Sequence, residues 1–79
     1  MVSRDMSNQS YVELPGPGQD HIRITCVPAV GYRDEPHFRV SVRENEGRLR
    51  QGPEIPYSRL GEFFQGLLEL SAECFASTV

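Results

Sequence analysis

The sequence predicts an α+β fold, in which a four-stranded antiparallel sheet is followed by one C-terminal amphipathic helix (ββββα). Two observations predict this order. Apolar and polar residues alternate in several short segments before residue 52, and after residue 60 the apolar residues recur in steps of three and four. The helix is expected to pack on one face of the sheet, because an amphipathic helix must bury its apolar stripe. At 79 residues the chain has room for a single domain.

Each strand is expected where alternation is bounded by turn residues. The clearest case is 21–28, where Ile22 and Ile24 alternate with polar neighbours. The other three expected strands are SYVEL (10–14), HFRVSVRE (37–44) and RLRQ (48–51), separated by PGPG, PAVGYRDEP and ENEG. Residues 1–9 are polar and aperiodic, so they are expected to form a flexible tail before a single domain over 10–79.

The last third is expected to form the amphipathic helix. Pro56 supplies a stop and Ser58 a candidate N-cap. The apolar stripe consists of Leu60, Phe63, Phe64, Leu67, Leu68, Leu70, Cys74 and Phe75. At about 100° per residue this stripe is about 160° wide, which exceeds what a thin sheet covers. The surplus predicts a partner chain, either a second copy, which would make a homodimer, or a different protein. The expected interface residues are Phe64, Leu67, Leu68 and Leu70.

Arginine is concentrated on one side of the expected sheet. The chain has eight arginines, no lysine and a net charge of -3. Alternation sends one set of side chains to the face opposite the helix: Arg23, Arg39, Arg43, Arg48, Arg50 and Tyr11. Residues 1–50 contain seven arginines and seven acidic residues, whereas residues 51–79 contain one and four. The sequence therefore predicts a cationic sheet face and an acidic outer helix surface.

A basic, aromatic-bearing sheet with no helix on that side suits single-stranded DNA or RNA. The phosphate backbone binds along the positively charged residues, and the bases stack on aromatic rings or guanidinium planes. Reading of duplex DNA is less favoured, because no second helix is available to enter a major groove. The alternative is that these arginines are ordinary solvated residues, paired across strands with Glu13, Glu44 and Glu46.

Other chemistries find little support in the sequence. His21 and His37 have no nucleophile and orienting group at recognisable spacing, so no catalytic residue is assigned and the chain is not expected to be an enzyme. Cys26 and Cys74 are expected to be buried free thiols that pack as small hydrophobes, and no metal site or cofactor is predicted. With no apolar segment at the N-terminus and none long enough to span a bilayer, a cytoplasmic protein is the default expectation.

Residues 38–70 resemble the single-stranded-DNA-binding transcriptional coactivator family of the positive-cofactor-four type, which is related to the whirly and Pur-type folds. The shared elements are a strand ending in Val-Arg, a turn with glycine, a basic strand, an Ile-x-apolar-cap element and a helix with an early aromatic residue. In this sequence they are Val42, Arg43, Gly47, Arg48, Arg50, Ile55, Tyr57, Ser58 and Phe63 or Phe64. One departure is QGPE, with Pro53 and Glu54, where family members usually carry a lysine-rich approach.

This resemblance implies four antiparallel strands and a helix, with dimerisation through helix and strand contacts. It also implies single-stranded DNA across the sheet, with a role in transcription regulation or in replication and repair, and it supports Arg43, Arg48 and Arg50 as binding residues. Two hypotheses therefore remain. One is a dimeric single-stranded nucleic-acid-binding module. The other is a small protein-interaction module, an adaptor or an inhibitor, that binds no nucleic acid.

Overall fold

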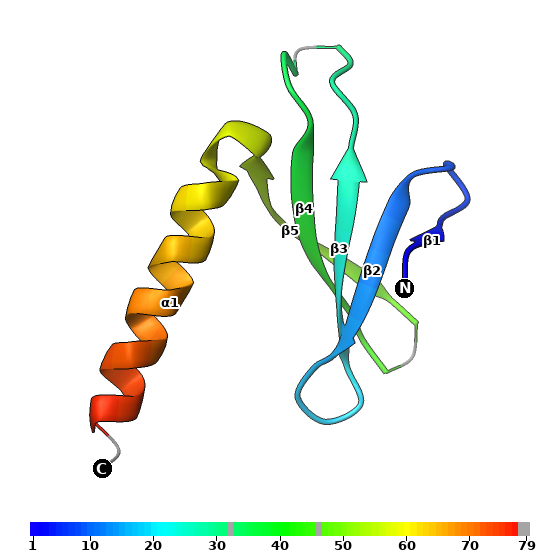
Figure 1. The fold of residues 1–79 in the computed structure, drawn as a ribbon. Coiled ribbons are helices and arrows are strands. Elements are labelled where there is room, and N and C mark those ends of the chain that lie inside the picture. Colours follow the sequence, from blue (N-terminus) through cyan, green and yellow to red (C-terminus); the bar gives the residue numbers. More distant parts are fainter. Residues whose placement is uncertain (32, 46, 78–79) are drawn as a thin grey trace.

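The chain forms an antiparallel sheet followed by one long helix (Figure 1). The computed structural model describes residues 1–31, 33–45 and 47–77, with only the backbone of residues 76 and 77. The elements are β1 (Ser3–Arg4), β2 (Ser10–Pro15), β3 (His21–Val27), β4 (His37–Arg43), β5 (Leu49–Pro56), the 3-10 helix η1 (Tyr57–Arg59) and α1 (Leu60–Ser77). Each strand pairs with its neighbours in chain order. In the described part of the chain, no helix is long and apolar enough to cross a membrane.

The expected alternation is confirmed in β2, β3 and β4. Residues directly opposite each other across a strand pair place their side chains on the same face. On one face Val12 lies opposite Ile24, which lies opposite Val40. On the other, Glu13 lies opposite Arg23, which lies opposite Ser41. The three central strands therefore separate an apolar face from a polar face, as the sequence predicts.

The expected flexible tail instead contributes a short edge strand. Ser3 pairs with Tyr11, and Arg4 pairs with Ser10. The turn between β1 and β2 is closed by the Asp5 carboxylate, which accepts hydrogen bonds from the backbone N–H groups of Ser7 and Gln9, each at 2.9 Å. The described sheet has five strands, so the four-stranded prediction is one strand short.

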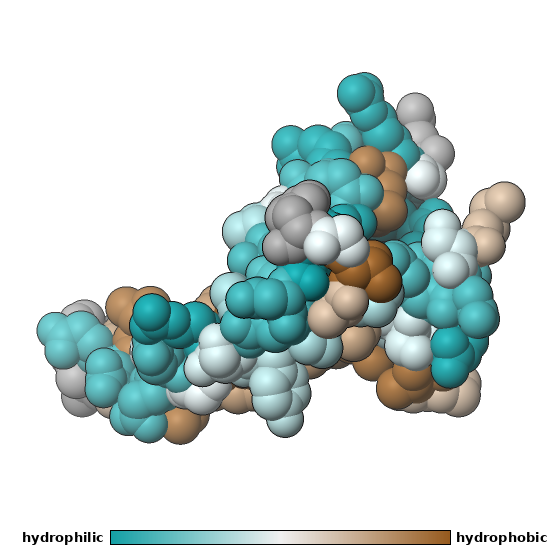
Figure 2. All heavy atoms as spheres, turned by 90° about the horizontal axis from the view of Figure 1, so that it is seen from above, coloured by the Kyte–Doolittle hydropathy of each residue, from teal (hydrophilic) through white to brown (hydrophobic). Residues whose placement is uncertain are grey.

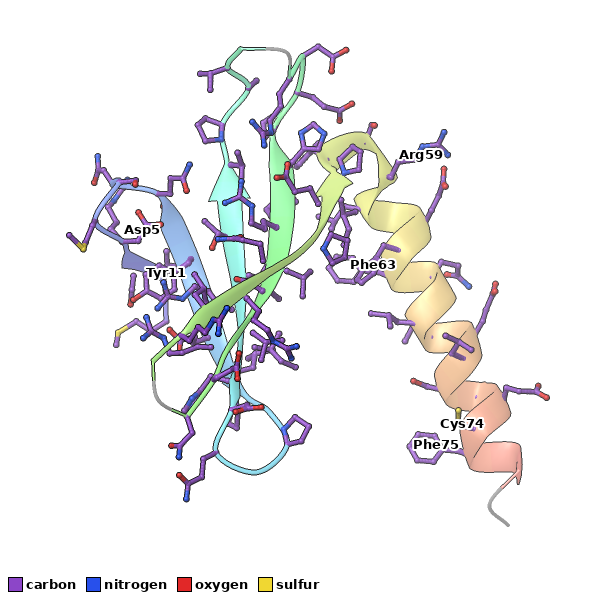
Figure 3. All side chains as sticks on the ribbon, turned by 180° about the vertical axis from the view of Figure 1, so that it is seen from behind. Asp5, Tyr11, Arg59, Phe63, Cys74 and Phe75 are labelled. Carbon is purple, nitrogen blue, oxygen red and sulfur yellow. The ribbon has the colours of Figure 1, made fainter. Side chains whose placement is uncertain are left out.

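The sheet curls toward its polar face. In Figure 1 β5 runs behind β3 and β4, and the reverse view in Figure 3 shows it crossing in front of them. Among the described residues, the buried side chains are Arg23, Thr25, Val27 and Ser41, all on this concave side. The apolar residues of the opposite, convex face are only half-buried or exposed. The expectation of a sheet with its apolar face inside is therefore wrong for this single chain.

A bulge in β5 reverses the side-chain directions expected for residues 48–51. Arg39 pairs with Glu54 and Ser41 with Gln51, so two residues, Gly52 and Pro53, lie opposite Val40. A Cβ at Gly52 would collide with the carbonyl oxygen of Val40. Because a one-residue shift exchanges the two faces, the start of β5 has the opposite orientation to the one predicted.

The C-terminal helix projects away from the sheet instead of packing across it (Figure 1). The Phe38 and Tyr57 rings, 6.3 Å apart, join the sheet to η1. Only the start of α1 approaches the sheet, at a small apolar hollow of about 220 Å³ lined by Ile24, Phe38, Val40, Ile55, Leu60, Phe63 and Phe64. The predicted helix is confirmed, but its predicted packing on one face is wrong. Figure 2 shows apolar and polar side chains along this projecting arm.

Candidate nucleic-acid interface

The concave face gathers four of the six predicted binding residues. Tyr11 lies opposite Thr25, and Thr25 lies opposite Arg39, while Arg23 and Arg43 follow the same alternation. Tyr11 points into this face in Figure 3. The guanidinium carbon of Arg23 lies 3.9 Å from the centroid of the Tyr11 ring, a cation–π contact. One face of the Tyr11 ring is therefore already occupied by a protein cation.

The other two predicted residues, Arg48 and Arg50, do not join this cluster. Because of the β5 bulge, Arg50 lies opposite Val42 on the convex side, and Leu49 takes the place beside Arg43. Arg50 forms a 3.3 Å ion pair with Glu44. Arg48 is exposed and lines a separate hollow with Asp20, Glu44 and Asn45. The prediction of one continuous patch of five arginines is wrong.

Glu13 organises the first group of arginines on the concave face. Its Oε2 atom accepts hydrogen bonds from Nη2 of Arg23 at 2.7 Å and from Nε of Arg23 at 3.1 Å. Its Oε1 atom lies 3.6 Å from Nε of Arg43. The Arg23 side chain is buried, whereas that of Arg43 is 37% exposed. Arg43 is thus the more accessible cation of this triad.

Glu54 organises a second triad, with Arg33 and Arg39. Arg33 donates to both carboxylate oxygens, at 3.0 and 2.9 Å, and Arg39 donates twice to Oε2, at 3.2 and 3.0 Å. These hydrogen bonds, the ones from Arg33 first, lower the pKa of Glu54 from 4.5 to about 2. Glu54 therefore remains ionised at any ordinary pH.

The Glu13 triad leaves the concave face with an excess of positive charge. The guanidinium groups of Arg23 and Arg43 face the single Glu13 carboxylate, so this triad carries a net charge of +1. Part of the alternative reading is also correct, since Glu13 and Glu44 do pair with arginines. Glu46 lies outside the described residues. Charge compensation on this face is real but incomplete.

A hollow at the open end of the curl exposes part of this charge. It has a volume of about 520 Å³ and is lined by Arg4, Asp5, Met6, Ser7, Tyr11, Arg23, Arg43 and Leu49. One edge of the sheet contributes residues of β1 and of the β1–β2 turn, and the other edge contributes the start of β5. The remaining lining residues come from the strands between these edges. Arg4, Arg43 and Tyr11 suit an anion attached to a planar ring, whereas Arg23 is buried and the Asp5 carboxylate is held by the β1–β2 turn.

Several members of this site are not evident from the sequence. Alternation predicts Glu13 only as a surface partner of arginines, although its position opposite Arg23 follows from the strand register. Arg33 lies in the loop before β4, where no periodicity fixes side-chain direction. Glu54 stands where the resembled family carries a lysine-rich segment, and the bulge that directs it toward Arg39 has one sequence signal, the Gly52-Pro53 pair within a strand.

The described residues offer little support for other chemistries. No group of three or more His, Cys, Asp or Glu among them could hold a metal ion. Cys26 and Cys74 are free thiols, but Cys26 is only half-buried and Cys74 is exposed, so the expected burial of both is wrong. His37 Nδ1 lies 2.9 Å from the carbonyl oxygen of Glu35, so this ring is within hydrogen-bond distance of the loop that precedes β4.

Comparison with protein-family models, with curated proteins and with solved structures gives no match to this chain. The function of the chain is therefore inferred from the concave and convex faces of its sheet.

Proposed function

We propose that this protein is a single-stranded nucleic-acid-binding module that uses the concave face of its sheet, in transcription regulation or in replication and repair. The observation that carries the proposal is the gathering of Tyr11, Arg39 and Arg43 on one concave face, where Arg23 and Arg43 share the single carboxylate of Glu13. The resemblance over residues 38–70 points to the same class of ligand.

The binding residues take different roles. Arg43 and Arg39 keep guanidinium N–H groups beyond those bonded to the glutamates, and these donate to phosphate oxygens. Tyr11 stacks a base on the ring face that Arg23 leaves open. Arg23 is too buried to meet the ligand directly, so it acts by holding Tyr11 in place. Arg48 and Arg50 contribute only to the general electrostatic field.

A pair of double variants tests the proposal. Fluorescence anisotropy is measured with a labelled oligothymidylate at low and moderate salt. Arg39→Ala with Arg43→Ala is expected to weaken binding by about tenfold or more, because it removes the phosphate donors of the concave face. Arg48→Ala with Arg50→Ala makes the same change in net charge on the other side of the sheet, and it is expected to change affinity by less than about threefold.

The salt dependence gives a second readout of the same site. With Arg39 and Arg43 as the phosphate donors, about two phosphates are contacted per chain, which predicts a slope of about -1.4 for log K against log salt. Absence of binding by the unmodified chain at low salt would remove the proposal. Equal losses in the two double variants would remove the assignment to the concave face.

A second candidate function, a protein-interaction module, is favoured by the exposed apolar side chains of α1. All four predicted interface residues, Phe64, Leu67, Leu68 and Leu70, are exposed, and Leu68 is 66% exposed. Under this function the arginine variants leave partner binding unchanged, whereas Leu68→Glu abolishes it. Retention of partner binding by both arginine double variants, with no oligonucleotide binding by any form, would favour this second function.

A further inference from the structure

We infer that the convex face of the sheet and the apolar stripe of α1 are two halves of one homodimer interface, with α1 of each copy lying across the sheet of the other. The partner in this interface is a second copy of the chain, and the dimer does not depend on nucleic-acid binding.

The helix cannot cover its own sheet without breaking its junction. β5 ends at Pro56, η1 begins at Tyr57 and α1 begins at Leu60, so no flexible loop separates strand from helix. The backbone N–H of Tyr57 donates to the carbonyl oxygen of Pro36 at 2.9 Å. The Glu35 carboxylate accepts from the backbone N–H of Ser58 at 2.7 Å and from its Oγ at 3.0 Å. The β3–β4 loop therefore fixes the direction in which α1 leaves (Figure 3).

The chain consequently presents two apolar surfaces at once. On α1, the exposed stripe contains Phe63, Phe64, Leu67, Leu68 and Leu70. On the sheet, the convex face carries Val12, Leu14, Ile22, Ile24, Val40 and Val42, which are half-buried except for the exposed Leu14. Two apolar surfaces of matching chemistry, each still accessible to solvent, can cover each other in a two-fold symmetric pair.

The size of these surfaces is sufficient for a stable dimer. The first turns of α1, up to Phe64, already line the hollow on the chain's own sheet, so about 13 residues, or about 20 Å of helix, remain for a partner. A 160° arc on a cylinder about 11 Å across is about 15 Å wide, so this part of the stripe covers about 300 Å². Two stripes and two matching sheet areas bury about 1,200 Å² in total, which is the lower end of the range for specific protein interfaces.

The charges on α1 are placed where they do not oppose self-association. Glu62, Glu69 and Glu73 fall within about 40° of one another and diametrically opposite the middle of the apolar stripe. They therefore remain in solvent when the stripe is covered. An acidic chain can pair with an identical acidic chain through this geometry, because like charges do not meet at the contact.

The test compares one substitution on each surface by sedimentation equilibrium of the full chain. Leu68→Glu lies on the helix stripe, and Leu14→Glu lies on the convex face at a position that is 49% exposed in the single chain. Both are expected to weaken dimerisation by about 100-fold or more, because each buries a carboxylate in an apolar contact. Gln65→Glu on the far side of α1 and Gln19→Glu in the exposed β2–β3 turn add the same charge and are expected to leave dimerisation unchanged. Far-UV circular dichroism checks that each variant remains folded.

Mixing the two interface variants separates helix-on-sheet docking from helix-on-helix docking. A mixed dimer retains one intact contact, the α1 of the Leu14→Glu chain on the sheet of the Leu68→Glu chain, so mixing is expected to restore part of the dimer. Dimerisation of Leu14→Glu alone at full strength would overturn the inference in favour of contact between helices. An unmodified chain that stays monomeric at high micromolar concentration would overturn it in favour of a different protein as the occupant.

Discussion

Glu13 and Glu54 determine how much positive charge the concave face presents. Each carboxylate bridges two guanidinium groups, and Glu13 also fixes Arg23 over the Tyr11 ring. A phosphate that approaches this face competes with a carboxylate for the same N–H groups, because both are oxygen anions of similar geometry. Under the proposed function, these glutamates therefore limit affinity while they order the arginines.

Replacement of either glutamate by glutamine is expected to tighten oligonucleotide binding. Glu13→Gln and Glu54→Gln each release two guanidinium groups from an anion, which adds about one phosphate contact and steepens the salt slope by about 0.7. Glu44→Gln, which frees Arg50 on the convex side, changes net charge equally and should leave the slope unchanged. Anisotropy over a salt series measures both quantities. Equal slopes for all three variants would show that only total charge matters.

The pKa of Glu54 predicts a specific sensitivity to acid. Because this pKa falls from 4.5 to about 2 on folding, ionised Glu54 favours the folded chain. The contribution is fully present above about pH 4.5, the unfolded value, and is lost as the pH falls toward 2. Urea unfolding at pH 6 and pH 3 should show a smaller acid-induced loss for Glu54→Gln than for the unmodified chain. An identical loss in both would contradict the assigned pKa.

At the scale of the elements, the β5 bulge decides which side chains share a face. Gly52 and Pro53 lie opposite Val40, which turns Leu49 toward Arg43 and Arg50 toward the convex side. The bulge requires glycine for a steric reason, since a Cβ at Gly52 meets a backbone carbonyl that cannot move independently of β4. The bulge therefore places Arg50 on the face away from the candidate interface.

Two Gly→Ala substitutions test this steric constraint. Gly52→Ala is expected to lower the free energy of unfolding by about 1–3 kcal/mol, because the added methyl group displaces backbone. Gly61→Ala in α1 meets open space and is expected to raise it by up to about 1 kcal/mol, since alanine favours helix. Chemical denaturation of both variants provides the comparison. Unchanged stability in Gly52→Ala would show that the bulge relaxes freely.

For the whole molecule, the sequence predicts the parts better than their assembly. Alternation in 21–28 and 37–44 and the helical spacing after residue 60 identify the elements, since local periodicity reflects which side of an element meets apolar surroundings. The same patterns do not say whether those surroundings belong to the same chain. The helix approaches the sheet only at its first turns, because β5 runs directly into η1 and α1 and the hydrogen bonds from Ser58 to Glu35 hold that junction.

The candidate site was also only partly predictable. The alternation of side-chain directions correctly groups Tyr11, Arg23, Arg39 and Arg43 on one face, because a strand without a bulge keeps a strict period of two. Alternation does not reveal the curl that buries Arg23, since curl is a property of the complete sheet. It also cannot place Arg33, which reaches Glu54 from a loop. The number of accessible cations therefore depends on tertiary structure.

A backbone amide NMR titration of the ¹⁵N-labelled chain with a short oligothymidylate at low salt tests most directly whether nucleic acid binds the concave face of the sheet and not α1. We expect the largest chemical-shift changes on the concave face, at Tyr11, Glu13 and Arg43, while the resonances of Leu67, Leu68 and Leu70 in α1 stay in place. Shift changes concentrated in α1 or around Arg48 and Arg50, or none at saturating oligonucleotide, would contradict this expectation.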